Sequence, residues 1–240
     1  MEALDFEVWG ANALFTDPIF RAEKQSYPVP THQALVGVVS SIYWKPTLIW
    51  HIDKVRIMNQ VEMETKSVRP LDKTFSLDHN SLAFYTYLHA PRYQVRCHFE
   101  WNMERDDLAV DRNEKKHLAI FKRALKAGGR RDIFLGTREC QAYVKPAHFG
   151  DDFGVYDDTG RVDFGQMFYG YHYPDEHAEK DFSVALWDAF MDRGVITFPR
   201  LEDCTNVQKI RDVEMQPYDV PKLTQSVDKL YSELGEEAGQ

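Results

Sequence analysis

The apolar residues of the first 145 positions switch between two spacings, one typical of strands and one typical of helices. Residues 4–9 alternate apolar and polar side chains, which predicts a strand. A long loop is expected over residues 10–30, which carry Gly, Asn, Asp, Pro and Ser. Thr31 then offers an N-cap for a helix that Pro46 ends. The predicted buried stripe of this helix, at i, i+3, i+4 and i+7, consists of Leu35, Val38, Val39 and Ile42.

Three strand-like runs follow the first predicted helix. Residues 47–58 are rich in β-branched and aromatic side chains. Residues 82–88 and 93–101 are two further β-rich, aromatic runs, separated by Ala90 and Pro91. We therefore expect these last two runs to pair with each other as a hairpin.

A second helix is predicted from Asp111 or Asn113 to Gly128, because glycine is the usual residue just beyond a helix end. Residues 132–144 then return to a strand pattern. The predicted buried stripe of the second helix consists of Leu118, Phe121, Ala124 and Leu125.

This order of elements predicts an α+β fold with a ferredoxin-like, RRM-like split βαβ domain over residues 1–147. The same architecture underlies a common RNA-binding module. Residues 148–240 are acidic, and their strand-like runs at 162–173 and 195–198 predict a small antiparallel β-sheet domain. An amphipathic helix is expected over residues 221–234.

The charge distribution, the cysteine content and the apolar runs limit the class of protein and the partners that we expect. The net charge of -9 argues against general nucleic-acid binding, but residues 111–131 hold eight Lys or Arg against two Asp or Glu. Three widely spaced cysteines predict neither a disulfide framework nor a zinc site. No apolar run is long enough for a membrane span, and the acidic N-terminus is not typical of a secretory signal. We expect a cytoplasmic protein without a metal or cofactor.

The start of the second helix holds the residues best suited to chemistry. Lys115 and Lys116 lie at the positive end of the helix dipole, where a bound phosphate would offset their charge. His117 is suited to proton transfer near neutral pH, and Tyr43 can donate a hydrogen bond or a proton. From the residues alone, a partly buried structural histidine flanked by surface lysines explains the same pattern.

Other residues are candidates for RNA contacts. Aromatic side chains can stack on bases, and lysine or arginine can hold phosphates. A helix C-cap and a core aromatic explain the same residues without RNA, so both interpretations stay open. These candidates are Trp44, Lys45, Lys115, Arg123, Arg130, Arg131 and Arg138.

Acidic pairs raise the alternative of a metal-dependent nuclease. Asp106-Asp107, Asp151-Asp152 and Asp157-Asp158 lie in turn-forming contexts and are better explained as turns than as magnesium ligands. The sequence also lacks HExxH, GxSxG, Walker and Rossmann motifs.

Three stretches together resemble the fifth family of CRISPR-associated proteins in its subtype I-C form. The first comprises residues 13–18 (ALFTDP), 26–31 (SYPVPT) and 34–37 (ALVG), and runs into 42–46 (IYWKP). The second is the pair Lys116 and His117, and the third is GGRRDIFLGTREC over residues 128–140. The resemblance covers nearly the whole chain, with looser matches at residues 163–168 (DFGQMF) and 194–198 (GVITF).

The resemblance implies a metal-independent endoribonuclease that cuts the repeat of the precursor CRISPR RNA 3′ of its stem-loop. It also implies that the protein stays on the 5′ handle as a subunit of the Cascade surveillance complex. The family's catalytic tyrosine, lysine and histidine fall on Tyr43, Lys116 and His117. A non-catalytic RNA-binding scaffold and a metal-dependent DNA nuclease remain the alternatives.

Overall fold

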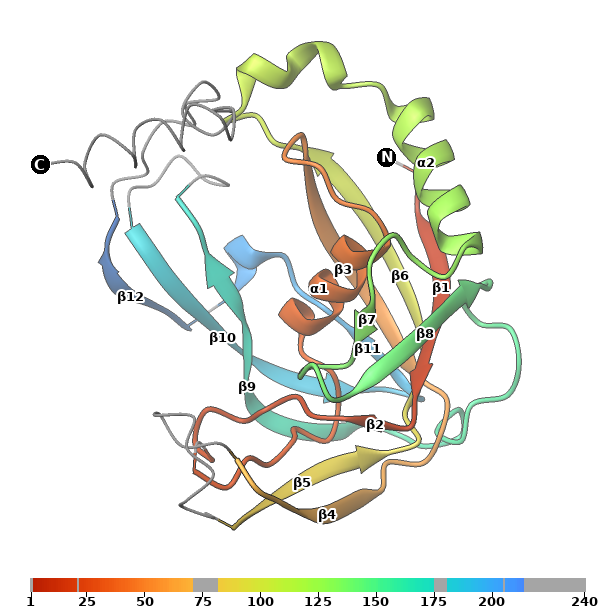
Figure 1. The fold of residues 1–240 in the computed structure, drawn as a ribbon, viewed down its shortest axis with the longest axis vertical. Coiled ribbons are helices and arrows are strands. Elements are labelled where there is room, and N and C mark those ends of the chain that lie inside the picture. Colours follow the sequence, from red (N-terminus) through yellow and green to blue (C-terminus); the bar gives the residue numbers. More distant parts are fainter. Residues whose placement is uncertain (1, 21, 71–81, 175–180, 205, 214–240) are drawn as a thin grey trace, which may run out of the picture.

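The computed structural model describes residues 2–20, 22–70, 82–174, 181–204 and 206–213. The helix predicted over residues 221–234 lies outside the described residues. Within them the chain is a mixed α/β protein with few helices and a curled antiparallel sheet (Figure 1). The predicted α+β class is thereby confirmed at the level of mixed helix and antiparallel strand.

The largest sheet has six strands in the order β11-β3-β6-β1-β8-β7, and every neighbouring pair is antiparallel. The edge strand β11 comes from beyond residue 147 and pairs Ile196 with Val55 of β3. The division of the chain at residue 147 stays a prediction. The six strands are β1 (Leu4–Gly10), β3 (Leu48–Ile57), β6 (Arg92–Trp101), β7 (Ile133–Phe134), β8 (Gln141–Pro146) and β11 (Val195–Thr197).

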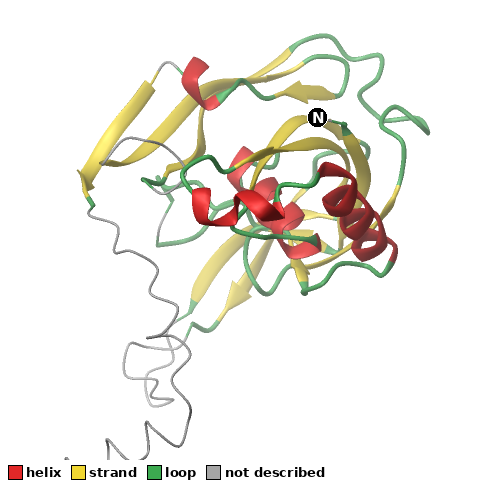
Figure 2. Cartoon of the chain, turned by 90° about the horizontal axis from the view of Figure 1, so that it is seen from above, coloured by secondary structure: helices red, strands yellow, loops and turns green. Residues whose placement is uncertain are grey.

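Two α-helices, α1 (His32–Ile42) and α2 (Glu114–Lys126), pack on this sheet and touch each other. The view from above shows them close together beside the curved strands (Figure 2). Both begin where the sequence predicts: the side chain of Thr31 accepts a hydrogen bond from the Ala34 amide, and Asn113 caps α2 in the same way. The predicted apolar stripes of both helices are buried in one core with the strands.

Two three-stranded sheets flank the main one, below it and to its left in Figure 1. The first has the order β2-β5-β4 and the second β12-β10-β9. Their strands are β2 (Asn12–Ala13), β4 (Met63–Val68), β5 (Ala83–His89), β9 (Val162–His172), β10 (Asp181–Met191) and β12 (Asn206–Asp212). Two short 3-10 helices, η1 (Asp106–Asp111) and η2 (Leu201–Asp203), complete the described elements.

The expected hairpin between residues 82–88 and 93–101 is wrong. The two runs are the strands β5 and β6, but β5 pairs with β2 and β4, whereas both edges of β6 are occupied by β1 and β3. Ala90 between them has a positive φ of 43°, and this left-handed residue redirects the chain from one sheet to the other. An alternating pattern predicts a strand but does not specify its neighbours.

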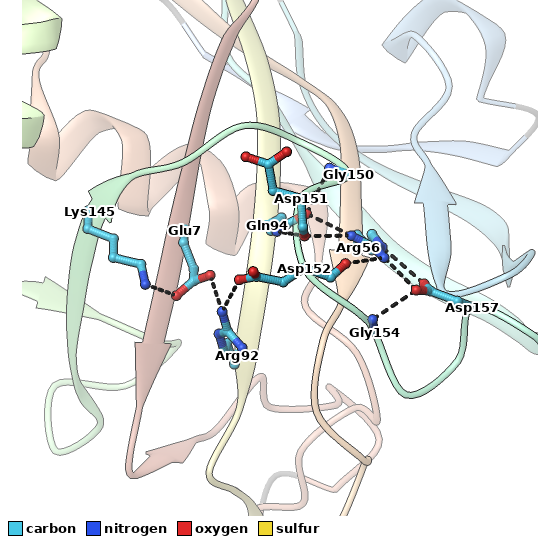
Figure 3. Close-up of polar contacts among 10 residues, drawn as sticks. All are labelled: Glu7, Arg56, Arg92, Gln94, Lys145, Gly150, Asp151, Asp152, Gly154 and Asp157. Atoms are coloured by element: carbon cyan, nitrogen blue, oxygen red, sulfur yellow. Dashed lines mark hydrogen bonds and ion pairs between the residues drawn. The ribbon is translucent and has the colours of Figure 1, made fainter.

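A polar network fastens residues 150–157 across the main sheet (Figure 3). At its centre the buried guanidinium of Arg56 on β3 donates to both carboxylate oxygens of Asp157, to Gln94 on β6, and to the backbone carbonyls of Asp151 and Asp152. Each of the three guanidinium nitrogens of Arg56 therefore donates to at least one acceptor.

The same network continues on β1, where the buried Glu7 takes ion pairs from Arg92 at 2.7 Å and from Lys145 at 2.9 Å. Arg92 on β6 also bonds the carboxylate of Asp152. Charge-assisted bonds thus link strands β1 and β6 to the loop after β8.

The described part of the chain holds no helix long and apolar enough to cross a membrane. Cys97, Cys140 and Cys204 are free and buried.

Candidate active site

Tyr43 and His117 meet where α1 ends and α2 begins. Tyr43 is the residue that closes α1, and its backbone carbonyl accepts a 2.9 Å bond from the Trp50 indole N–H. His117 lies in the first turn of α2. The Oη atom of Tyr43 lies 2.8 Å from Nδ1 of His117, and both residues are almost fully buried, at 1% and 0% exposure.

The partners of His117 determine which of its ring nitrogens carries the proton. Its Nε2 lies 2.8 Å from the backbone carbonyl of Asp111, which can only accept. Nε2 must therefore be the protonated nitrogen, and in the neutral ring Nδ1 accepts the Tyr43 hydroxyl proton. The imidazole packs edge-to-face against two aromatic rings. Its ring centroid lies 5.6 Å from that of Trp101 and 6.2 Å from that of Phe99.

Beside this pair, three donors converge on the carboxylate of Asp111. Lys45 Nζ lies 3.2 Å from each carboxylate oxygen, Thr47 Oγ1 donates at 2.9 Å, and Lys116 Nζ makes a hydrogen bond to the same group. We call Lys45, Thr47 and Lys116 the cation cradle. The hydrogen bond from Lys116, together with those from Thr47 and Lys45, holds the pKa of Asp111 well below its usual range.

Burial raises the pKa of Tyr43, and the negative charge of Asp111 raises it further, while Arg130 opposes the shift. The guanidinium of Arg130 lies 5.5 Å from the centre of the Tyr43 ring. The phenol is therefore protonated at neutral pH and acts as a hydrogen-bond donor.

Of the residues predicted to contact RNA, Lys45 and Arg130 lie at the Tyr43–His117 pair, and Lys116 joins them from α2. Trp44 is adjacent in sequence and half exposed. Within the described residues, no side-chain contact links the other predicted cations to the pair. These exposed cations are Lys115, Arg123, Arg131 and Arg138.

The glycine-containing turns after α2 have structural reasons of their own. The backbone amides of Arg130 and Arg131 both donate to the carbonyl of Ser41 near the end of α1, which brings this turn to the site. Gly136 has a φ of +92°, and a Cβ there would lie 2.0 Å from the carbonyl oxygen of Leu14. Close backbone approach therefore requires glycine at position 136.

The acidic pairs do not form a metal centre in the described part of the chain, where no three His, Cys, Asp or Glu side chains are placed to hold a metal ion. Their carboxylates instead pair with arginines: Asp107 with Arg105, and Asp152 with Arg92.

Sequence reasoning missed Asp111 and Thr47 as members of the site. The sequence offers Asp111 only as a possible start of the second helix and Thr47 only as a residue of the strand-like run over 47–58. Asp111 lies two residues before Asn113, the N-cap of α2, and this closeness to the helix start that carries Lys116 and His117 is the available signal.

A comparison with known protein families shows which family this chain belongs to. A family model described as CRISPR-associated protein (Cas_Cas5) matches residues 3–199. The chain belongs to this Cas5 family. The family resemblance predicted from the sequence motifs is thereby confirmed.

Similar proteins agree with the Cas5 assignment. The chain is 30% identical over 182 residues to the CRISPR pre-crRNA endoribonuclease Cas5d of Mannheimia succiniciproducens, a match that covers 67% of this chain and 75% of the relative. It is 29% identical over 176 residues to the protein of the same name from Thermus thermophilus, covering 70% and 73%. A crystal structure of a CRISPR-associated protein superposes with a TM-score of 0.74 at 35% identity, covering 86% of this chain and 96% of the other.

Proposed function

We propose that this Cas5 chain is an endoribonuclease that cleaves the repeat of precursor CRISPR RNA. Two relatives of about 30% identity carry the name CRISPR pre-crRNA endoribonuclease Cas5d. The observation that carries the proposal is the Tyr43–His117 hydrogen bond beside Lys45 and Lys116. A proton-transfer group next to two cations is what phosphodiester cleavage without a metal requires.

In the proposed reaction the 2′-hydroxyl oxygen attacks the adjacent phosphorus, and the bond from phosphorus to the 5′ oxygen breaks. One group takes the 2′ proton and another protonates the leaving 5′ oxygen, which yields a 2′,3′-cyclic phosphate and a 5′-hydroxyl. Lys116 stabilises the charge that develops on the phosphate oxygens. The proton on Nε2 of His117 favours the general-acid role for this residue, with Tyr43 holding the tautomer through Nδ1.

The wider assignment follows the family resemblance. Cleavage falls 3′ of the repeat stem-loop, and the protein then remains on the 5′ handle as a subunit of the subtype I-C Cascade complex in the cytoplasm. Lys45, Trp44 and Arg130 hold the RNA next to the reacting phosphate, and the exposed cations of α2 and its following turns extend that surface.

The proposed architecture is a ferredoxin-like split βαβ domain extended by further strands. It is supported by the central strand order β3-β6-β1-β8, with α1 between β1 and β3 and α2 between β6 and β8 along the chain.

The test uses the cognate repeat RNA, end-labelled, in excess EDTA. Beside it runs the same RNA with a single 2′-deoxy nucleotide at the cleavage position. Cleavage of the first RNA at one site and none of the second is the expected result. Tight binding of both RNAs without cleavage of either would make the chain a non-catalytic scaffold, and activity that EDTA abolishes would contradict metal independence.

A further inference from the structure

The cation cradle already holds an anion, the carboxylate of Asp111. Two ammonium groups, from Lys45 and Lys116, and the hydroxyl of Thr47 donate to its two oxygens. Charged and neutral donors that converge on one anionic group also form the binding sites of phosphate oxygens. These same bonds favour the charged form of the carboxylate and lower its pKa.

Asp111 also covers the reactive edge of His117. Its backbone carbonyl accepts the Nε2–H bond at 2.8 Å, and its carboxylate Oδ2 lies 3.5 Å from the same nitrogen. An RNA phosphate that is to meet Nε2 needs the space and the cations that Asp111 occupies. Two anions cannot share this place, because their charges repel at such short range.

The segment that carries Asp111 is loosely packed. None of the residues of η1 is buried. The contacts that hold its ends are polar: the Arg112 guanidinium donates to the carbonyls of Asn102 and Arg105, and Asp107 pairs with Arg105. Displacing η1 therefore exposes little apolar surface and carries a small hydrophobic cost.

We propose that Asp111 is an internal substitute for a phosphate of the RNA, and that RNA binding exchanges this carboxylate for a backbone phosphate in the cation cradle. The exchange moves η1 and opens Nε2 of His117 to the substrate. The inference rests on the proposed function for the identity of the phosphate, and it deepens that function by assigning the group that closes the site in the free protein.

The first test uses inorganic phosphate and the protein alone. In Asp111→Asn the cradle loses its internal anion, and we expect the melting temperature to rise with phosphate at constant ionic strength. The wild type and Asp107→Asn should not respond. Asp107→Asn is the matched control, because it makes the same change on η1 at a carboxylate that faces Arg105 and not the cradle. The double variant Asp111→Asn/Lys116→Met should lose the response.

The second test measures the affinity for repeat RNA made uncleavable by a 2′-deoxy nucleotide. We expect Asp111→Asn to bind roughly three- to tenfold more tightly than the wild type, the scale of one or two partly exposed charge-assisted bonds. Asp111→Glu, which keeps the anion, should bind like the wild type and shows whether the position tolerates substitution.

The proposal is overturned if Asp111→Asn is folded but gains no phosphate response, or if it binds the RNA no more tightly than Asp107→Asn. The phosphate measurement needs no RNA cleavage. A phosphate response in a protein that fails the endoribonuclease assay would therefore support the role of Asp111 and contradict the proposed function.

Discussion

The Oη atom of Tyr43 lies 2.8 Å from Nδ1 of His117, although 74 residues separate the two along the chain. The contact joins the end of α1 to the start of α2. Because Nε2 of His117 donates to the carbonyl of Asp111, the imidazole is held from both sides in one tautomer. Positioning of this kind is what a proton-transfer group needs before substrate arrives.

Replacing His117 with alanine should lower the cleavage rate of repeat RNA by about 10²–10⁴-fold, the usual contribution of a positioned acid or base. RNA affinity should stay within a few-fold, because the side chain is fully buried and Lys45 and Lys116, the cations proposed to hold phosphate, are unchanged. Single-turnover cleavage and filter binding measure the two quantities. The exposed His89, changed to alanine, serves as the control. An equal loss of binding and cleavage would refute this separation of roles.

Tyr43→Phe removes the hydroxyl that donates to His117 and keeps the buried ring. We expect cleavage to fall by about 10–10²-fold and the free energy of unfolding to fall by about 1 kcal/mol, the net worth of one buried hydrogen bond. The pKa of Tyr43 is raised by burial, so its hydroxyl should stay protonated through neutral and weakly alkaline pH. A rate–pH profile in which Tyr43 accounts for a loss of activity below pH 10 would contradict this assignment.

Arg56→Lys should destabilise the fold through the network that fastens residues 150–157. The buried guanidinium makes a forked pair with Asp157, and lysine cannot reproduce the fork. We expect a loss of about 1–3 kcal/mol by urea unfolding. The matched control is Arg161→Lys, at an exposed pair with Asp163, where the change should be under about 0.5 kcal/mol.

The same pair has a defined pH dependence. The hydrogen bond from Arg56 is the main cause that lowers the pKa of Asp157 in the folded protein. A carboxyl with a lowered folded pKa contributes stability above its unfolded pKa and loses it as the pH falls through the folded value. The difference in stability between wild type and Arg56→Lys should therefore shrink below about pH 4. A difference that is constant down to pH 2 would show that the ion pair is not its source.

His32 should make the fold sensitive to acid. It is buried, stacked on Tyr169 at 4.2 Å, and its Nε2 accepts from the Ile52 amide. Burial lowers its pKa to about 3, with a further effect of His51. The unfolded chain binds this proton near pH 6.5 and the folded chain does not, so stability should fall as the pH drops from 6.5 toward 3.

The variant His32→Gln, which keeps an acceptor but does not titrate, should flatten that part of the stability curve. The difference should grow to a few kcal/mol, since each unit of pKa shift is worth about 1.4 kcal/mol. Urea unfolding at a series of pH values measures it, with the exposed His89→Gln as the control. Parallel curves for wild type and His32→Gln would contradict the prediction.

Local features of the sequence predicted the helices well. The spacing of apolar residues and the caps Thr31 and Asn113 determine where α1 and α2 begin, because capping and periodicity involve only neighbours along the chain. The long, ordered motifs that run to Tyr43 and over residues 128–140, with the pair Lys116 and His117, likewise indicated the family. These signals are carried by residues close in sequence, and the structure adds little to them.

Strand pairing was decided only by the tertiary structure. The alternation in β5 and β6 fits any neighbour, and the left-handed Ala90 sends them to different sheets. Strand β4 is not predicted from the sequence, because its side chains are mostly exposed and no buried face marks it.

The chemical environment of the site was also a tertiary result. Sequence by itself determined that Tyr43, Lys116 and His117 are the candidate residues. That Tyr43 and His117 touch, that both are buried, and that Asp111 occupies the cation cradle depend on how the end of α1, the start of α2 and η1 come together. Such contacts are long-range and are fixed by packing of the whole core, whereas a sequence pattern records only the types of residue and their spacing.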